Sequence, residues 1–70
     1  MTEKNLVNTI KVQRAKKDLT QEELAELAQV TRKTINTVEN GIYIPSTYLA
    51  LKLAGVLGVT VEELFQIKET

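Results

Sequence analysis

Apolar residues recur along this chain every three or four positions, in short runs that polar residues separate. This spacing is that of the buried face of an amphipathic helix. The runs predict five helices, at about residues 8–17, 21–28, 32–40 and 47–57 and in a short stretch after Thr60. Two to six residues join one helix to the next, which is typical of a compact all-helical domain.

The same spacing predicts which side chains face the core. The expected core residues are Leu24, Leu27 and Ala28 in the second helix, Ile35 and Val38 in the third, and Leu49, Leu53 and Leu57 in the fourth.

Local signals mark where the helices begin and end. The runs "TQEE" and "TVEE" place Thr20 three residues before Glu23 and Thr60 three residues before Glu63. Both are capping boxes, in which a threonine and a glutamate satisfy each other's backbone N–H groups at a helix start. Gly41 is a natural stop for the third helix.

The two ends of the chain allow two interpretations. In "FQIKET" (65–70) apolar and polar residues alternate, as in a short strand, and "NLVN" (5–8) could pair with it. Residues 6–7 could equally form the first turn of the first helix. Neither segment is long enough to decide whether 5–8 and 65–69 form a sheet.

Composition excludes several kinds of chemistry. The 70 residues contain no cysteine and no histidine, which removes disulfides and the commonest ligands of structural metal sites. The glutamates lie at helix starts, so no acid/base pair is visible, and we expect neither an enzyme nor a cofactor. No apolar run approaches the roughly 20 residues of a membrane span. We therefore expect one cytoplasmic domain without a membrane contact.

Charge is balanced in total but not along the chain. Nine cations match nine anions, yet residues 21–31 carry only anions, and Arg32 and Lys33 follow them directly. With Thr31 as N-cap, both cations lie in the first turn of the third helix. The helix dipole disfavours each of them there by roughly 0.3–1 kcal/mol.

A helix-turn-helix explains this placement. Only "QVT" (29–31) joins the second and third helices, and so short a linker forces a sharp crossing. The second helix of such a pair enters the DNA major groove with its N-terminal residues against the bases. Arginine there fits guanine with two hydrogen bonds, worth roughly 1–3 kcal/mol of discrimination. The alternative is that Arg32 and Lys33 are an ordinary solvated pair.

Longer motifs carry a family resemblance. They are "LTQEELAELAQVTRKTINTVENG" (19–41), "YIPS" (43–46), "LALKLAGVLGV" (49–59) and "EELF" (62–65). In these, residues 6–67 resemble the Cro/phage-repressor type (XRE-like) of helix-turn-helix transcriptional regulator, in particular its small stand-alone members. The resemblance implies an all-α, five-helix lambda-repressor-like domain over 1–70, with the helix-turn-helix at about 20–40.

The resemblance also implies roles for individual residues. The expected base-contacting residues are Arg32, Lys33, Asn36 and Thr37. The expected phosphate-contacting residues are Gln21, Thr31, Thr34, Asn40, Tyr43 and Ser46. Arg14 and Glu39 match a pair that ties the first helix to the third.

Three positions depart from the family pattern. Gln29 replaces the usual glycine of the turn, where a left-handed backbone would strain glutamine by roughly 1 kcal/mol. Gln13 stands in place of a leucine, and Ile42 and Ile44 replace polar loop residues.

The expected partner is double-stranded DNA, bound by a homodimer at a palindromic operator. A C-terminal segment at about 60–68 offers apolar residues for dimerisation, namely Val61, Leu64, Phe65 and Ile67. The alternative is a protein-interaction module of the same fold, such as a bridging coactivator or the antitoxin partner of a toxin. No effector domain is visible, so we expect no small-molecule effector.

Overall fold

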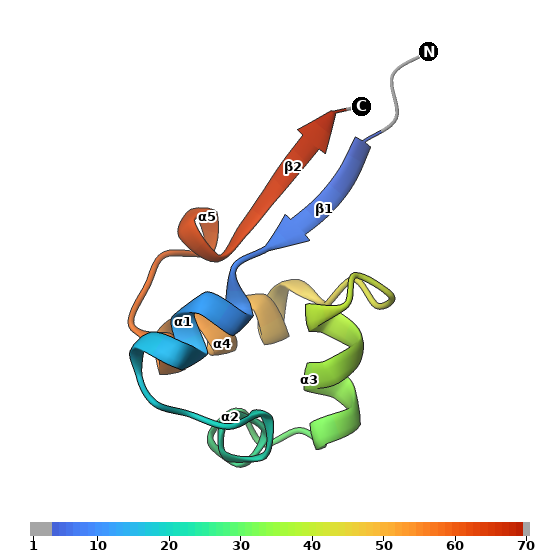
Figure 1. The fold of residues 1–70 in the computed structure, drawn as a ribbon. Coiled ribbons are helices and arrows are strands. Elements are labelled where there is room, and N and C mark those ends of the chain that lie inside the picture. Colours follow the sequence, from blue (N-terminus) through green and yellow to red (C-terminus); the bar gives the residue numbers. More distant parts are fainter. Residues whose placement is uncertain (1–3, 70) are drawn as a thin grey trace.

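The computed structural model describes residues 4–69, which form five helices and a two-stranded sheet (Figure 1). In chain order the elements are β1 (Lys4–Asn8), α1 (Ile10–Lys16), α2 (Gln21–Ala28), α3 (Arg32–Glu39), α4 (Thr47–Leu57), α5 (Val61–Leu64) and β2 (Phe65–Glu69). The all-helical prediction is therefore confirmed, with a short sheet added to it.

Hydroxyl side chains cap four of the five helices as the sequence predicts. Each capping hydroxyl accepts a hydrogen bond from the backbone N–H three residues further along the chain, at 3.0–3.2 Å. The capping residues are Thr20, Thr31, Ser46 and Thr60. The capping boxes of α2 and α5 are both complete. These local bonds explain why the helix starts could be placed to the residue.

The core lies between the helices and the base of the sheet. Its buried members are Ile10, Leu24, Ala25, Ala28, Ile35, Val38, Leu49, Leu53, Ala54, Leu57, Leu64 and Phe65. The expectation that Leu27 faces inward is wrong, because its side chain is 55% exposed. The inner stripe of α2 is Leu24, Ala25 and Ala28, and the two alanines allow neighbouring helices to approach closely.

The two ends of the chain pair with each other. Strands β1 and β2 are antiparallel, with Leu6 opposite Ile67 and Asn8 opposite Phe65. The pairing uses residues 4–8, so α1 begins at Ile10 and not at Asn8 as expected. Asn8 instead accepts a hydrogen bond from the Ile10 N–H at 3.1 Å through its side chain.

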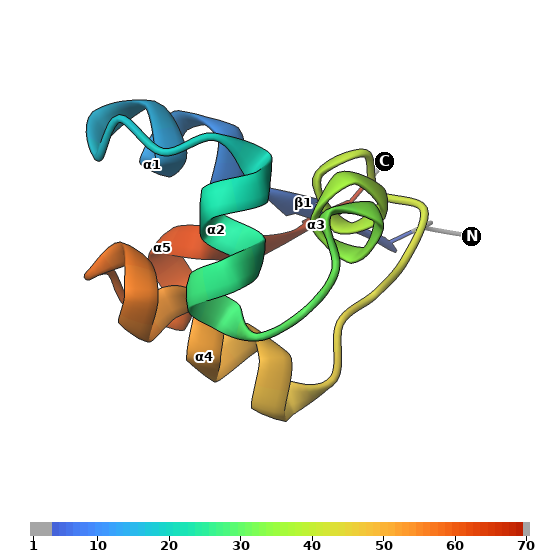
Figure 2. The ribbon, with the colours of Figure 1, turned by 90° about the horizontal axis from the view of Figure 1, so that it is seen from below.

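The arrangement separates two sides of the molecule. Seen from below, α2 packs against both α3 and α4 (Figure 2). Strands β1 and β2 project from the helices on the side away from α2 (Figure 1). No helix within residues 4–69 is both long enough and apolar enough to span a bilayer.

Candidate nucleic-acid interface

The N-terminal end of α3 presents two exposed cations. Thr31 caps the helix, and Ile35 and Val38 anchor its inner face in the core. This fixes Arg32 and Lys33 outward, in a first turn that contains no acidic residue. Within residues 4–69, neither cation makes a hydrogen bond or an ion pair.

Adjoining surface hollows connect the predicted DNA-contacting residues. Arg32 shares one hollow of about 310 Å³ with Lys33 and Asn36. It shares another, of about 460 Å³, with Thr20 and Gln21. The structure therefore brings the start of α2 next to the start of α3, as the helix-turn-helix prediction requires.

A third hollow continues this surface toward the loop between α3 and α4. It has about 370 Å³ and is lined by Lys33, Thr34, Thr37, Ile42 and Tyr43. Seven of the predicted contact residues thus line adjoining hollows, namely Gln21, Arg32, Lys33, Thr34, Asn36, Thr37 and Tyr43.

The threonines of this face also hold the helix start together. The Thr31 and Thr34 hydroxyl oxygens are 3.0 Å apart and share a hydrogen bond. Thr37 donates its hydroxyl to the carbonyl of Thr34 at 3.0 Å. Each hydroxyl therefore has a partner inside the protein before any contact with DNA.

The loop after α3 is apolar at its tip. Ile42 and Ile44 are 77% and 70% exposed, on either side of Tyr43. The backbone N–H groups of Ile42 and Tyr43 both donate to the Thr37 carbonyl, at 3.0 and 3.2 Å, which ties the loop to the helix end. Ser46, the last predicted phosphate contact, caps α4.

Glu39, at the last turn of α3, is the best-connected side chain of the site. Arg14 donates to its two carboxylate oxygens from Nε at 2.6 Å and from Nη2 at 3.2 Å. The two side chains are only 14% and 7% exposed. The predicted pairing of Arg14 with Glu39 is confirmed.

Gln21 also reaches Glu39, which the sequence did not indicate. Its Nε2 donates to Glu39 Oε1 at 3.1 Å. Its Oε1 accepts from Asn36 Nδ2 at 3.5 Å, and Asn36 Oδ1 accepts from Asn40 Nδ2 at 3.2 Å. Three predicted DNA-contacting amides thus form a chain of hydrogen bonds that ends on the carboxylate.

Asn8 is a second contributor that sequence reasoning missed. Its Nδ2 donates to the backbone carbonyls of Val38 and Glu39, at 3.0 and 3.3 Å. These bonds occupy two of the carbonyls that a helix leaves free at its C-terminal end. Strand β1 therefore helps to orient α3, although it lies far from Arg32.

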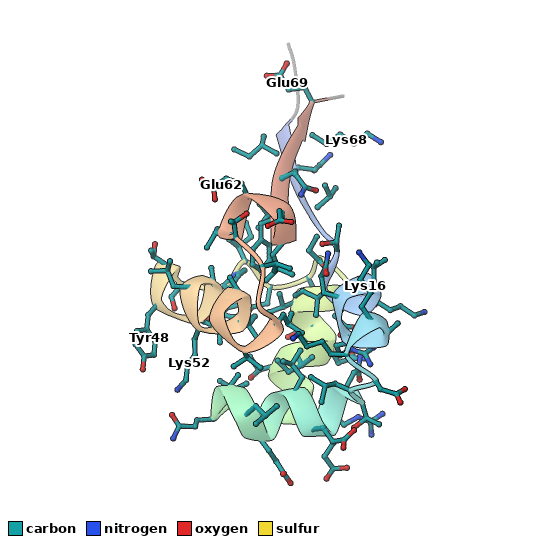
Figure 3. The ribbon with its side chains drawn as sticks, turned by 90° about the vertical axis from the view of Figure 1, so that its left-hand side faces the viewer. Lys16, Tyr48, Lys52, Glu62, Lys68 and Glu69 are labelled. Atoms are coloured by element: carbon teal, nitrogen blue, oxygen red, sulfur yellow. The ribbon has the colours of Figure 1, made fainter. Side chains whose placement is uncertain are left out.

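The turn between α2 and α3 contains the predicted strain. Gln29 has φ 60° and ψ 42°, which is the left-handed conformation. Its Oε1 accepts a hydrogen bond from Lys52 Nζ, and the ammonium also lies 5.5 Å from the centre of the Tyr48 ring (Figure 3).

The capping glutamates have altered acidity. The backbone N–H of Thr20 donates to Glu23 at 2.9 Å, and this bond, aided by the threonine side chain, lowers the glutamate's pKa. The backbone N–H of Thr60 lowers the pKa of Glu63 in the same way, with smaller contributions from the Thr60 hydroxyl and from the charge of Lys16. Both carboxylates are engaged in caps, so neither is a spare acid or base.

The expected dimerisation residues divide into two groups. Leu64 is fully buried and Phe65 is 9% exposed, so these side chains belong mainly to the core of the monomer. The expectation that they offer spare apolar surface was wrong, because the end of α5 and the start of β2 turn them inward over the other helices. Val61 is half-buried, and Ile67 is 70% exposed on β2.

An apolar groove lies beside α5. It has about 480 Å³, and its apolar lining is formed by Leu6, Pro45, Ala50, Leu51, Val61 and Phe65. Leu51 is 59% exposed there. The groove is formed by α4, α5, β1, the start of β2 and the loop before α4, and none of the predicted DNA-contacting residues lines it.

Comparison with known proteins agrees with this geometry. The family profile described as "Helix-turn-helix" matches residues 10–64. An HTH-type transcriptional regulator of Methanocaldococcus jannaschii is 47% identical over 58 residues, which are 83% of this chain and 88% of the relative. The HTH-type transcriptional regulator YgzD of Bacillus subtilis is 39% identical over 62 residues, covering 89% of this chain and 94% of its own.

Solved structures share the fold. A protein from Bacteroides fragilis superposes with a TM-score of 0.78 at 31% identity, over 87% of this chain and 98% of its own. The clp gene regulator ClgR of Corynebacterium glutamicum gives a TM-score of 0.73 at 30% identity. That match covers 77% of this chain and 57% of ClgR, so this chain spans little more than half of that regulator.

Proposed function

We propose that this chain, which belongs to the helix-turn-helix family of transcriptional regulators, binds a palindromic operator as a homodimer. Residues 20–40 are its helix-turn-helix, and α3 lies in the major groove of double-stranded DNA. The observation that carries this proposal is the pair of cations Arg32 and Lys33 at the capped and exposed start of α3, which make no hydrogen bond or ion pair among residues 4–69. A regulator of this kind acts in the cytoplasm and needs neither a cofactor nor a small-molecule effector.

Electrostatics supports the assignment of Arg32 and Lys33. Each cation opposes the helix dipole at a cost of roughly 0.3–1 kcal/mol in the free protein. Against DNA the same charges meet guanine acceptors or phosphates, and one bidentate arginine contact alone is worth roughly 1–3 kcal/mol. The arrangement is therefore unfavourable without DNA and favourable with it.

The remaining residues of the face receive supporting roles. Asn36 and Thr37 lie one turn further along α3, within reach of base edges. Gln21 at the start of α2 positions the phosphate backbone on one side of the helix. On the other side the backbone contacts come from Thr31, Thr34, Asn40, Tyr43 and Ser46, several of which also cap helices.

We infer dimerisation from the small size of the surface that one copy offers to DNA. Helix α3 has eight residues, and the net charge of zero gives little general attraction to DNA. A second copy doubles the contacts if the two α3 helices lie about 34 Å apart, one turn of B-DNA. The apolar groove beside α5, with Val61, Leu51 and the neighbouring Ile67, is the surface we assign to this contact.

Alanine variants test the DNA-binding half of the proposal. Arg32→Ala should weaken binding to a selected site by about 5- to 150-fold, which corresponds to roughly 1–3 kcal/mol, and should flatten the preference at one base pair. Lys68→Ala is the control, because Lys68 is an exposed cation on the projecting strand (Figure 3). Equal losses in the two variants would show that Arg32 contributes charge only.

Thermal melting completes that test. Removal of Arg32 takes away a charge that opposes the dipole, so the free domain should keep its melting temperature or gain slightly. A large fall in melting temperature, with DNA preference unchanged, would contradict the assignment.

Sedimentation at micromolar concentration tests the dimer. Leu51→Glu places a charge in the groove and should yield monomers, while Val12→Glu changes a similarly exposed residue of α1 outside the groove. A wild-type protein that is monomeric both free and on DNA would contradict the homodimer. A dimer that survives Leu51→Glu would place the interface elsewhere.

A protein-interaction module is the second candidate function. The exposed Ile42 and Ile44 and the zero net charge favour it, because both weaken phosphate binding. The two functions differ in binding to a random DNA pool at low and moderate salt. Binding that falls steeply with salt supports a DNA reader, and no binding at either salt supports the interaction module.

A further inference from the structure

We propose that the buried carboxylate of Glu39 fixes the orientation of the amide side chains of Gln21, Asn36 and Asn40. In this orientation the amides meet DNA with N–H donors, and Asn36 cannot read adenine with both of its polar atoms. This inference rests on the proposed function, since it concerns the same reading surface.

The direction of the hydrogen-bond chain follows from the chemistry of Glu39. An ionised carboxylate only accepts hydrogen bonds. Gln21 must therefore turn its Nε2 toward Glu39, at 3.1 Å, and its Oε1 away from it. The two hydrogen bonds from Arg14 hold the carboxylate in place.

Each later link inherits this direction. Gln21 Oε1 can only accept, so the atom of Asn36 that faces it, at 3.5 Å, must be the amide nitrogen. Asn36 Oδ1 then points along α3 and accepts from Asn40 Nδ2 at 3.2 Å. A choice between two amide orientations, which geometry alone would leave open, is thus made by a carboxylate that is only 7% exposed.

The groups left for DNA follow by counting donors. Each amide nitrogen carries two hydrogens. Each of the three amides uses one hydrogen within the hydrogen-bond chain and keeps one N–H free for DNA. Phosphate oxygens only accept, so these spare donors suit the DNA backbone.

The consequence for base reading concerns Asn36. An asparagine recognises adenine by donating to N7 and accepting from the N6 amino group, which requires both amide atoms to face the base. Here Asn36 Nδ2 is turned toward Gln21 and Oδ1 toward Asn40. One spare N–H donates equally well to adenine N7, to guanine N7 or O6 and to thymine O4, and disfavours only cytosine.

Selection of bound sequences from a random DNA pool tests the proposal. The base pair under Asn36 is the one whose preference flattens in Asn36→Ala. At that pair the wild type should favour adenine over guanine by less than about 3-fold. The double variant Gln21→Ala, Asn40→Ala frees both ends of Asn36, and adenine should then be favoured by about 10-fold, as a bidentate contact gives.

This double variant keeps the hydrogen bonds between Arg14 and Glu39, and a thermal melt checks that it remains folded. Loss of the phosphate contact of Gln21 weakens all sites equally and does not change preference. The proposal is overturned if the wild type already singles out adenine at that pair, if Asn36→Ala flattens no pair, or if the double variant gains no adenine preference.

Side-chain amide NMR of the free protein separates this inference from the proposed function. Asn36→Ala should shift the Nε2 proton signals of Gln21, although residue 36 does not touch Glu39, and Lys68→Ala should not. If no DNA binds at any salt, the proposed function fails, but these NMR shifts still report whether the hydrogen bonds from Asn36 to Gln21 exist. If the Gln21 signals do not move in Asn36→Ala, the proposed chain of hydrogen bonds is wrong.

Discussion

The left-handed turn at Gln29 makes an unusual prediction, that replacing a side chain by glycine stabilises this domain. The conformation of Gln29, φ 60° and ψ 42°, costs a residue with a Cβ roughly 1–2 kcal/mol. Gln29→Gly removes that cost and adds conformational entropy to the unfolded chain, worth roughly 0.4–1 kcal/mol against it. The hydrogen bond from Lys52 is also lost, but it is exposed and water replaces it.

The net gain should be about 0.5–1 kcal/mol, which raises the melting temperature of a domain this size by about 2–8 °C. Gly41→Ala is the mirror-image control. Gly41 has φ 73°, and a Cβ added there meets no atom within 4 Å, so the variant suffers the backbone strain alone. Gly41→Ala should lower the free energy of unfolding by about as much as Gln29→Gly raises it.

Urea unfolding with a common slope measures both variants, and Gln29→Ala isolates the bond to Lys52 because it keeps the strained backbone. The reasoning is refuted if Gly41→Ala loses stability as expected while Gln29→Gly does not gain. That result would mean that the glutamine side chain itself compensates the strain.

Three other substitutions test the network, a helix start and the core. Glu39→Ala leaves the largely buried guanidinium of Arg14 without its carboxylate and should cost roughly 3–5 kcal/mol in urea unfolding, and a loss below about 1 kcal/mol would contradict the network. Thr20→Ala should cost roughly 0.5–2 kcal/mol. The lowered pKa of Glu23 stabilises the fold above the unfolded value of about 4.3, and this contribution disappears as pH falls through the folded pKa. Thr20→Ala keeps the backbone N–H that lowers this pKa most, so its melting curves should retain most of the wild type's sensitivity to pH below about 4.3, and a complete loss of that sensitivity would contradict the pKa assignment. Leu53→Ala empties a fully buried site and should cost roughly 2–5 kcal/mol, and a calorimetric loss below that range would show that the core collapses around the gap.

Local interactions explain which parts of the fold could be predicted from the sequence. The capping boxes of α2 and α5 join residues three positions apart, so a four-letter motif contains all their geometry. The helix stripes were mostly correct for the same reason. Leu27 was misplaced because the boundary of a stripe on an eight-residue helix depends on where the neighbouring helices lie.

Contacts between distant residues explain the rest. Strands β1 and β2 pair residues about 60 positions apart, and each strand is too short to be identified from its sequence pattern alone. From the sequence, Leu64 and Phe65 are interpreted as surplus apolar surface. In the fold their side chains complete the core, and only the path of the backbone through α5 and β2 shows this. The bond from Gln21 to Glu39 depends on rotamers of two helices, which no spacing in the sequence specifies.

The two ends of α3 are built in opposite ways, and this contrast supports the proposal that α3 reads DNA. At the C-terminal end, Glu39 binds Arg14 of α1 and Gln21 of α2, and Asn8 of β1 binds the adjacent carbonyls. At the N-terminal end, Arg32 and Lys33 have no hydrogen bond or ion pair with any residue between 4 and 69. A helix that only had to complete the core would gain from acidic residues in its first turn, because they complement the dipole. Rigid attachment at one end, with unpartnered charge at the other, instead suits a helix that must present its first turn to an anionic ligand without moving.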